Sequence, residues 1–364
     1  MATTNATILI PDISGFTEFM TTTELNHSTL AINMLIDAMI KAIGDEYEVA
    51  EIEGDAVLLV RKGTAPSREE ILNTCMNIFN AFHYQRKWMQ QHMVCPCGAC
   101  QAITNLTLKF VVHHGPVAEI TVGRFVKQSG PEMIVAHRLL KNSIDSNEYL
   151  LITEKLFDDV TDTTVQDELE WASSSEDYPS IGTVNYRFAL LNKAREKVPE
   201  LPALKNDYCV DGTCYVEKPI PVNFRDVYMV VMNIPGRAEW VPGLRKVEQE
   251  IPAVFIGSIH YCTFDNYQAV VSPLRMTISD KQIFYAESCN IPELNLSLVY
   301  EFVFNNLNEH SCFFACRFLN NGQSPVPEEM HAALLQSMQD LAEKLAIYCT
   351  QMEGTSLKPA FQKD

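Results

Sequence analysis

Two aspartates stand beside apolar runs that are typical of buried strands. Asp12 follows the run 8–10 (ILI), and Asp55 precedes the run 56–60 (AVLLV). Short apolar runs bounded by Gly or Pro indicate strands. Two carboxylates brought together repel unless a cation lies between them, and Mg²⁺ favours oxygen ligands of this kind. The pair predicts a divalent-metal site, although Asp beside Gly is also ordinary turn chemistry.

A second cluster is the run CPCGAC, which places Cys95, Cys97 and Cys100 close together. Thiolates bind Zn²⁺ well, and a structural site needs four ligands in a tetrahedron. The candidates for the fourth ligand are Cys75, His83 and His92. Since no second cysteine pair follows, free thiols in a loop remain the alternative to zinc.

The elements that must position these residues are helices and strands in alternation. Residues 17–43 carry apolar side chains at helical steps and predict one helix. Ser67 and Glu70 have the spacing of a capping box, which predicts a helix over 67–93. Strands are expected at 106–114, 116–126, 149–152 and 186–191, and a helix at 130–144. The acidic, serine-rich stretch 159–180 predicts a solvated loop or exposed helix. The order favours an α+β or α/β sandwich.

The second half changes character after a charged, proline-containing linker at 193–206. Strands are expected at 209–216, 260–264, 269–271, 283–286, 296–304 and 312–319, and apolar residues at 334–349 predict a long helix. We therefore expect domains at 1–192 and 207–364. An apolar pocket between sheet and helix is the candidate site, although large apolar residues also fill plain cores. The candidate lining residues are Trp240, Tyr261, Tyr285, Tyr300 and Phe302.

Composition limits the partners. The formal net charge is −18, which disfavours nucleic acids and anionic membrane surfaces. No run approaches the roughly 18 apolar residues of a membrane helix, and no signal peptide is apparent. We expect a cytoplasmic protein whose 11 cysteines are reduced.

The N-terminal half, about residues 6–192, resembles the catalytic domain of class III nucleotidyl cyclases. The resemblance rests on DISGFT at 12–17, on Gly54 and Asp55 before an apolar strand, and on HHGPV at 113–117. It continues, in part, at Gly130, Ala136 and Arg138.

The resemblance implies site residues and partners. Asp12, Asp55 and the backbone of Ile13 would hold Mg²⁺ or Mn²⁺, with Phe16 and Thr17 of the same motif near the nucleotide. Arg138 would stabilise the transition state, although it also fits a surface salt bridge. The nucleotide base would contact Glu51, the residue type that guanylate cyclases have at this position. It would also contact Lys127, which matches neither of the family's standard base-reading pairs. The family also implies a homodimer with sites across its interface.

Some positions depart from that family. Ile134 stands where the family has an asparagine that positions the ribose, and Ile134 cannot form a hydrogen bond. Ile134 and Lys127 thus alter the residues expected to contact the ribose and the base, whereas the expected metal ligands are kept. The second half, about residues 207–352, resembles the START-like or polyketide-cyclase-like helix-grip fold through Pro221, the motif around Trp240 and the long last helix. The pairing of the two resembles an uncharacterised bacterial family.

Two functions follow as hypotheses. In the first, the chain is a divergent nucleotidyl cyclase (a phosphorus–oxygen lyase) that binds a nucleoside triphosphate with Mg²⁺ or Mn²⁺ and weakly favours guanine. In the second, the cyclase fold is catalytically inactive, and the protein is a regulatory module whose C-terminal domain binds a hydrophobic small molecule.

Overall fold

The computed structural model describes residues 3–23, 25–95, 97–123, 125–158, 169–203, 216–251, 253–320 and 328–352. The chain forms two compact units. The first comprises Met1–Thr23, Ser28–Gln90 and Gln101–Pro202, and the second Glu24–His27, Gln91–Cys100 and Ala203–Asp364. Two short segments from the N-terminal half of the chain thus belong to the same unit as the C-terminal half, and the second of them contains the cysteine run.

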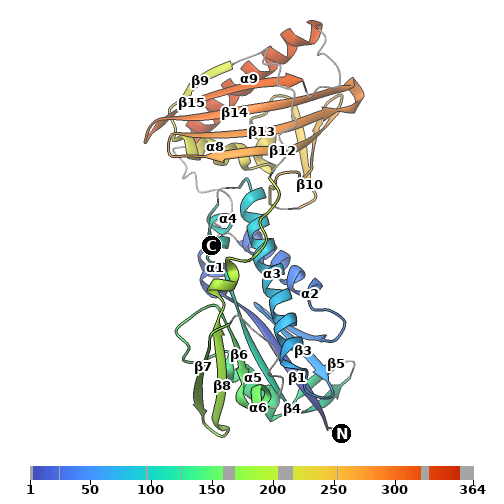
Figure 1. The fold of residues 1–364 in the computed structure, drawn as a ribbon. Helices are drawn as coiled ribbons and strands as arrows, with labels where there is room; N and C mark the ends of the chain where they lie inside the picture. Colours follow the sequence, from blue (N-terminus) through green and yellow to red (C-terminus); the bar gives the residue numbers. More distant parts are fainter. Residues whose placement is uncertain are drawn as a thin grey trace. The chain divides into compact units, whose positions relative to one another are not determined.

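The first part of the chain alternates strands and helices, as expected (Figure 1). In chain order the elements are β1 (Thr3–Ser14), α1 (Phe16–Thr22), α2 (Leu25–Lys41), β2 (Glu48–Glu53), β3 (Ala56–Lys62), α3 (Arg68–His92), α4 (Gly98–Ala102), β4 (Thr107–Val122), β5 (Phe125–Ser129), α5 (Pro131–Leu139), β6 (Tyr149–Thr153), α6 (Glu154–Asp158), β7 (Trp171–Tyr178), β8 (Gly182–Leu190) and α7 (Asn192–Arg195).

The sheet of the first unit has the order β2-β3-β1-β4-β6-β8-β7, and β5 pairs with β4. Only β4 and β6 run parallel among these pairs, so the sheet is mixed. β1 is buried without interruption from Ala6 to its end, and β3 from Ala56 to Val60. Continuous burial requires cover on both faces, which explains why these strands are uniformly apolar.

Helix α5 covers one face of this sheet. Its Met133 and Ala136 pack against Ile8 and Ile10 of β1 and Leu58 of β3. On an antiparallel pair, directly opposed residues point to the same face. Asp12 lies two residues beyond Ile10, so its side chain projects from the α5 face.

Several local expectations are corrected. The helix predicted over 17–43 is two helices, α1 and α2. Thr23 ends α1 in an extended conformation (φ −124°, ψ 171°), and its hydroxyl donates to the Phe19 carbonyl 2.5 Å away. Such side-chain bonds compete with helix continuation.

The strands predicted on either side of Pro116 are one strand, β4, with Pro116 opposite Asn5. The acidic stretch 171–178 is the edge strand β7, where charge discourages further pairing; residues 159–168 lie outside the described part.

The second unit is a seven-stranded antiparallel sheet of order β10-β11-β12-β13-β14-β15-β9 (Figure 1). The strand expected at 209–216 falls mostly outside the described residues, and β9 begins at Val216. The elements are β9 (Val216–Ile220), α8 (Phe224–Met232), β10 (Leu244–Gln249), β11 (His260–Phe264), β12 (Gln268–Ile278), β13 (Gln282–Ile291), β14 (Leu296–Asn308), β15 (Ser311–Asn320) and α9 (Glu328–Met352), with short 3-10 turns at Pro235–Glu239 and Pro292–Leu294. A further 3-10 turn, Ile103–Asn105, follows α4 in the first unit.

The core of this unit lies between the sheet, α8 and α9. Met338, Leu345 and Cys349 form the buried stripe of α9, and Phe302 and Phe304 of β14 join the same cluster. The α+β class is confirmed, as is a C-terminal antiparallel sheet with a long last helix. Within the described residues, no helix is both long and apolar enough to cross a membrane.

Candidate functional site

A row of polar side chains crosses the α5 face of the first sheet. The register places Glu53 opposite Ala56, Ala56 opposite Asp12, and Asp12 opposite Lys109. The side chain of Asp12 is largely buried, and its Oδ2 lies 3.2 Å from Lys109 Nζ. The ammonium group of Lys109 is therefore already paired with Asp12, the first predicted metal ligand.

Asp55 occupies the turn between β2 and β3, directly before Ala56. Gly54 has φ +65°, a conformation that glycine adopts without strain, and a side chain there would meet the ring of Phe16. The Ile13 amide donates to the Asp55 carbonyl at 3.1 Å, which fixes the turn against β1. Burial and the nearby charge of Asp12 raise the pKa of Asp55 to about 6. The two predicted carboxylates therefore converge, and a divalent cation would relieve their repulsion.

The predicted base-contacting residues also meet. Lys127 Nζ on β5 lies 2.7 Å from Glu51 Oε2 on β2, and this carboxylate raises the pKa of Lys127. A neighbouring pair joins His137 Nδ1 on α5 to Glu53 Oε2 at 3.7 Å. The α5 face of the sheet thus carries both the carboxylate pair and a donor–acceptor pair.

Arg138 and Ile134 lie one turn apart on the outer side of α5. Arg138 is exposed, and its carbonyl accepts a hydrogen bond from the Tyr178 hydroxyl at 3.0 Å. The Ile134 side chain is 54% exposed. Thr17 is likewise exposed, on the first turn of α1. In the described part of a single chain, Arg138 and Ile134 therefore face away from the sheet that Met133 and Ala136 contact.

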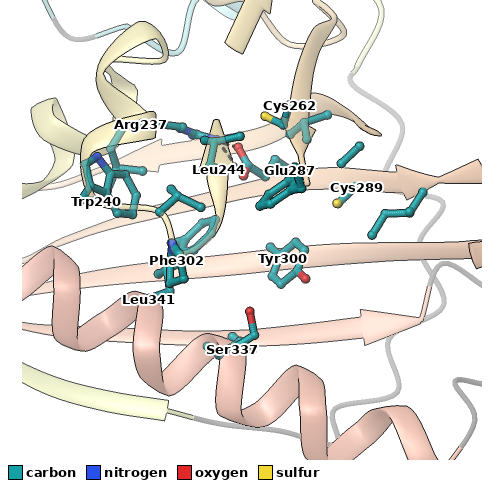
Figure 2. A pocket seen from close by; sticks show the side chains of 18 of the residues that line it. Arg237, Trp240, Leu244, Cys262, Glu287, Cys289, Tyr300, Phe302, Ser337 and Leu341 are labelled. Carbon is teal, nitrogen blue, oxygen red and sulfur yellow. Dashed lines mark hydrogen bonds and ion pairs between the residues drawn. The ribbon is translucent and has the colours of Figure 1, made fainter. Parts of the chain in front are cut away.

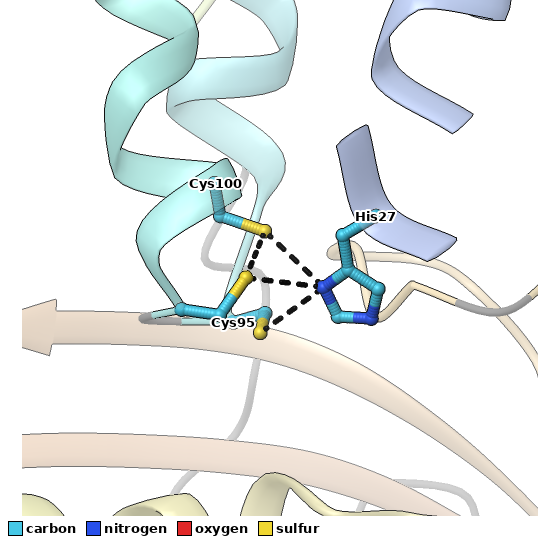
Figure 3. Close-up of side chains that lie close together, drawn as sticks. His27, Cys95 and Cys100 are labelled. Carbon is cyan, nitrogen blue, oxygen red and sulfur yellow. Dashed lines mark hydrogen bonds between the residues drawn. The ribbon is translucent and has the colours of Figure 1, made fainter. Parts of the chain in front are cut away.

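The three predicted cysteines converge on a histidine that the sequence interpretation missed (Figure 3). His27 Nδ1 lies 3.1 Å from Cys97 Sγ, 3.6 Å from Cys95 Sγ and 3.7 Å from Cys100 Sγ. Cys97 Sγ and Cys100 Sγ are 3.2 Å apart. The neighbouring thiols of Cys95 and Cys97 raise the pKa of Cys100.

The proposed fourth ligands Cys75, His83 and His92 are not the residue that completes this cluster. Cys75 is fully buried within α3, and His83 Nε2 lies 2.9 Å from Glu148 Oε1 in the first unit. His27 lies in the first turn of α2, 68 positions before Cys95, so spacing gave no signal for it. Cys97 and Cys100 have the C-x₂-C spacing that is typical of zinc sites, a signal that the sequence interpretation missed.

The backbone before the cysteines is held by the C-terminal half. Ile256 donates to the His92 carbonyl at 2.6 Å, and Val94 donates to the Val254 carbonyl at 3.1 Å. The Tyr228 hydroxyl donates to the Val94 carbonyl at 2.6 Å. The loop is therefore positioned by three hydrogen bonds and the burial of Val94 in the core of the second unit.

A cavity of about 100 Å³ lies between the second sheet and α9 (Figure 2). In Figure 2, Ser337 and Leu341 rise from α9 toward the strands that carry Tyr300 and Phe302. Arg237 and Glu287 form a buried ion pair at its wall, with Nη1–Oε1 at 3.0 Å. The cavity is thus apolar with one polar wall. Other lining residues are Val231, Trp240, Val241, Pro242, Leu244, Cys262, Phe264, Tyr267, Ala269, Val271, Cys289, Ile291 and Met338.

Three of the five predicted pocket residues, Trp240, Tyr300 and Phe302, line this cavity. Tyr285 is fully buried, and its hydroxyl donates to Glu287 Oε2 at 2.6 Å. Tyr261 precedes the lining residue Cys262 on β11, so alternation points it to the other face of the sheet.

Sequence comparison matches residues 32–149 to a family described as "Protein of unknown function (DUF2652)". An "Uncharacterized protein Rv2561/Rv2562" of Mycobacterium tuberculosis is 32% identical over 123 residues, which are 33% of this chain and 56% of that protein. The chain thus matches about half the length of this relative.

Structure comparison gives two further likenesses. The guanylyl cyclase Cya2 matches 52% of this chain and 92% of its own, with 13% identity and a TM-score of 0.39. DynU16, a putative protein in the dynemicin biosynthetic locus, matches 38% of this chain and 48% of its own, with 15% identity and a TM-score of 0.29. Scores this low are not sufficient to transfer a site or an activity.

Proposed function

We propose that the first unit is a divergent nucleotidyl cyclase domain that binds a nucleoside triphosphate with Mg²⁺ or Mn²⁺ at Asp12 and Asp55. The observation that carries this proposal is the convergence of the two carboxylates, with the pKa of Asp55 raised to about 6 by burial and by Asp12. The motif resemblance at 12–17 and 54–55 supports it independently. A bound divalent metal would neutralise phosphate charge and lower the pKa of an attacking hydroxyl.

The residues around the pair fit a polyphosphate. Lys109 lies 3.2 Å from Asp12 and also 3.5 Å from the Leu140 carbonyl, so its ammonium has a second partner nearby. Once a metal neutralises Asp12, Lys109 becomes available to a phosphate oxygen, which ammonium groups bind as point charges. Glu51 and Lys127 supply an acceptor and a donor for a base on the same face.

The exposed Arg138 and Ile134 fit a site that is completed by a second copy of the chain. A guanidinium matches phosphate oxygens with its planar fork, but on the outer side of α5 Arg138 would serve a partner's nucleotide. An exposed isoleucine there would be covered by the same contact. The proposed active form is therefore a homodimer.

Product analysis by mass spectrometry tests the proposal. The purified protein is incubated with each of the four nucleoside triphosphates and Mn²⁺, beside Asp12→Ala and the control Asp45→Asn, which changes an exposed turn residue. We expect a cyclic nucleotide from the native protein and the control but none from Asp12→Ala. No product from a folded protein, together with no stabilisation by Mn²⁺ and nucleotide in a thermal shift assay, would refute both catalysis and binding.

A second function is favoured by the cavity of the second unit. We propose that it binds a small molecule that is mostly apolar and carries one polar group facing Arg237 and Glu287. A cavity of about 150 Å³ holds benzene, so about 100 Å³ suits a ring-sized group rather than a long acyl chain.

Ligand-induced thermal stabilisation tests this second function. Small aromatic acids and alcohols are compared with long-chain fatty acids on the native protein. Ser337→Leu should fill the cavity and abolish stabilisation, whereas Ser337→Ala should not. Equal stabilisation of native protein and Ser337→Leu would place the ligand elsewhere.

A further inference from the structure

The imidazole of His27 and the thiols of Cys95, Cys97 and Cys100 form one compact cluster of four metal-binding groups. Ligands about 2.0–2.3 Å from a tetrahedral zinc ion lie about 3.5–3.8 Å from one another. The distances from His27 Nδ1 to the three sulfurs are 3.1, 3.6 and 3.7 Å. All four ligand atoms lie within 4.8 Å of one another. These three distances and the 3.2 Å between Cys97 Sγ and Cys100 Sγ lie within about 0.6 Å of the zinc values. The remaining two, from Cys95 Sγ to the other sulfurs, are at most 4.8 Å.

We propose that these four residues bind one Zn²⁺ ion as a closed Cys₃His site. Three soft sulfurs and one imidazole nitrogen in a tetrahedral set are the donors that zinc prefers. A disulfide explains the geometry less well. It would join two sulfurs at about 2.0 Å and leave the third thiol and His27 without a role.

The site is structural rather than catalytic. Four protein ligands leave no open position for water or substrate. His27, Cys97 and Cys100 are at most 8% exposed, and Cys95 is half-buried. The metal would cross-link His27, in the first turn of α2, to Cys95, to Cys97 and to Cys100 of α4, all within the second unit.

The surroundings hold the ligands in place and leave a path for the ion. Hydrogen bonds to Val254, Ile256 and Tyr228 fix the backbone just before Cys95. A cavity of about 150 Å³ touches the cluster; its lining includes His27, Cys95, Cys97, Met229, Met232 and Asn233. A preformed site with an entry path fits a metal that loads after or during folding.

Metal content and cobalt substitution test the proposal on the full chain. Protein purified under reducing conditions without chelator should contain about one zinc per chain by plasma mass spectrometry. After replacement, Co²⁺ should give the strong visible bands and thiolate charge-transfer absorption of a tetrahedral site. His27→Gln should lower zinc affinity by more than about 10-fold. Replacing only a residue that hydrogen-bonds to a metal ligand already lowers metal affinity by about that factor. Cys75→Ala, a buried cysteine remote from the cluster, should keep full metal content.

Two results would overturn the site. One is a folded, reduced native protein that neither contains zinc nor takes up Co²⁺ with thiolate absorption. The other is equal zinc content in native protein, His27→Gln and Cys97→Ser. If Cys97→Ser fails to fold, titration of the native protein with a mercurial thiol reagent decides: zinc should leave in step with about three thiols per ion, and release without thiol modification would refute thiolate ligation.

Discussion

Arg237 and Glu287 form a bidentate ion pair inside the core of the second unit. Nη1 and Nη2 of the guanidinium lie 3.0 Å from Oε1 and Oε2 of the carboxylate, and both residues are 5% exposed. Burial alone would raise the pKa of Glu287, but the charge and hydrogen bonds of Arg237 hold it below its usual value. The pair therefore stays ionised at the wall of the cavity.

Glu287→Gln should destabilise the protein by about 3–5 kcal/mol, because it leaves the buried Arg237 charge uncompensated. Urea unfolding would measure this. Replacing both partners, as Arg237→Met with Glu287→Leu, should recover most of the loss. The exposed pair Arg245–Asp265 is the control, and Asp265→Asn should leave the urea midpoint unchanged. Equal midpoints for Glu287→Gln and the native protein would show that the pair is not buried as described.

His260 should make the second unit sensitive to acid. Burial, and then the charge of Arg237, lower the pKa of His260 to about 4, against about 6.5 when unfolded. The folded state thus binds fewer protons than the unfolded state between these values, and stability is lost as pH falls from 6.5 to 4. We expect a loss of up to about 3 kcal/mol from this residue.

The measurement is the free energy of unfolding against pH for the native protein and His260→Gln. The variant should show a flatter curve between pH 6.5 and 4. His310→Gln, at an exposed position, should follow the native curve. A native slope that survives in His260→Gln would assign the acid sensitivity to other groups.

Asp55 should respond to pH in the opposite sense. Its pKa is raised to about 6, so the folded state binds an extra proton between about pH 4 and 6, and stability falls as pH rises through that window. Asp55→Asn should therefore raise the melting temperature at pH 8 without metal and leave it nearly unchanged at pH 4. Differential scanning calorimetry at both pH values checks this, with Asp45→Asn as control. A lower melting temperature for Asp55→Asn at pH 8 without metal would contradict the carboxylate repulsion.

Much of the fold could be predicted because local signals agreed with long-range packing. The capping box formed as expected: Glu70 N donates to Ser67 Oγ at 3.2 Å, and Ser67 N donates to Glu70 Oε2 at 2.6 Å. The apolar residues at alternate positions of β14 join the core of the second unit, as a strand with that face buried predicts: Leu296, Leu298, Phe302 and Phe304. The break after Thr23 was missed, because the apolar repeat that predicted the helix lies over 32–43 and says nothing about residues 21–29. In that polar stretch, threonine hydroxyls bond back to the backbone of α1.

Apart from the pairs Asp12–Asp55 and Glu51–Lys127, which the cyclase resemblance implied, side-chain clusters could be predicted only where their residues lie close in sequence. The three cysteines were evident in one run, but His27 reaches them only through the fold. No sequence motif indicated that Lys109 would lie beside Asp12, because this position depends on the register of β1 with β4. The Arg237–Glu287 pair was missed for the same reason: a charged residue in a 3-10 turn and another in β13 carry no sign that they are buried together.

Lys109→Met should separate the role of this lysine from that of the metal. Without metal, the variant should be less stable than the native protein, because Asp12 loses its cation. With Mn²⁺ alone, it should gain more stabilisation than the native protein, since the metal no longer competes with an ammonium group for Asp12. With Mn²⁺ and nucleoside triphosphate together, it should gain less, because a phosphate contact is gone. Thermal shift titrations measure all three, and Lys41→Met, which removes an exposed lysine paired with Asp37, is the control. If Mn²⁺ stabilised Lys109→Met and native protein equally, Lys109 and metal would not share Asp12, and the cation site at the carboxylate pair would have to be abandoned or moved toward Asp55.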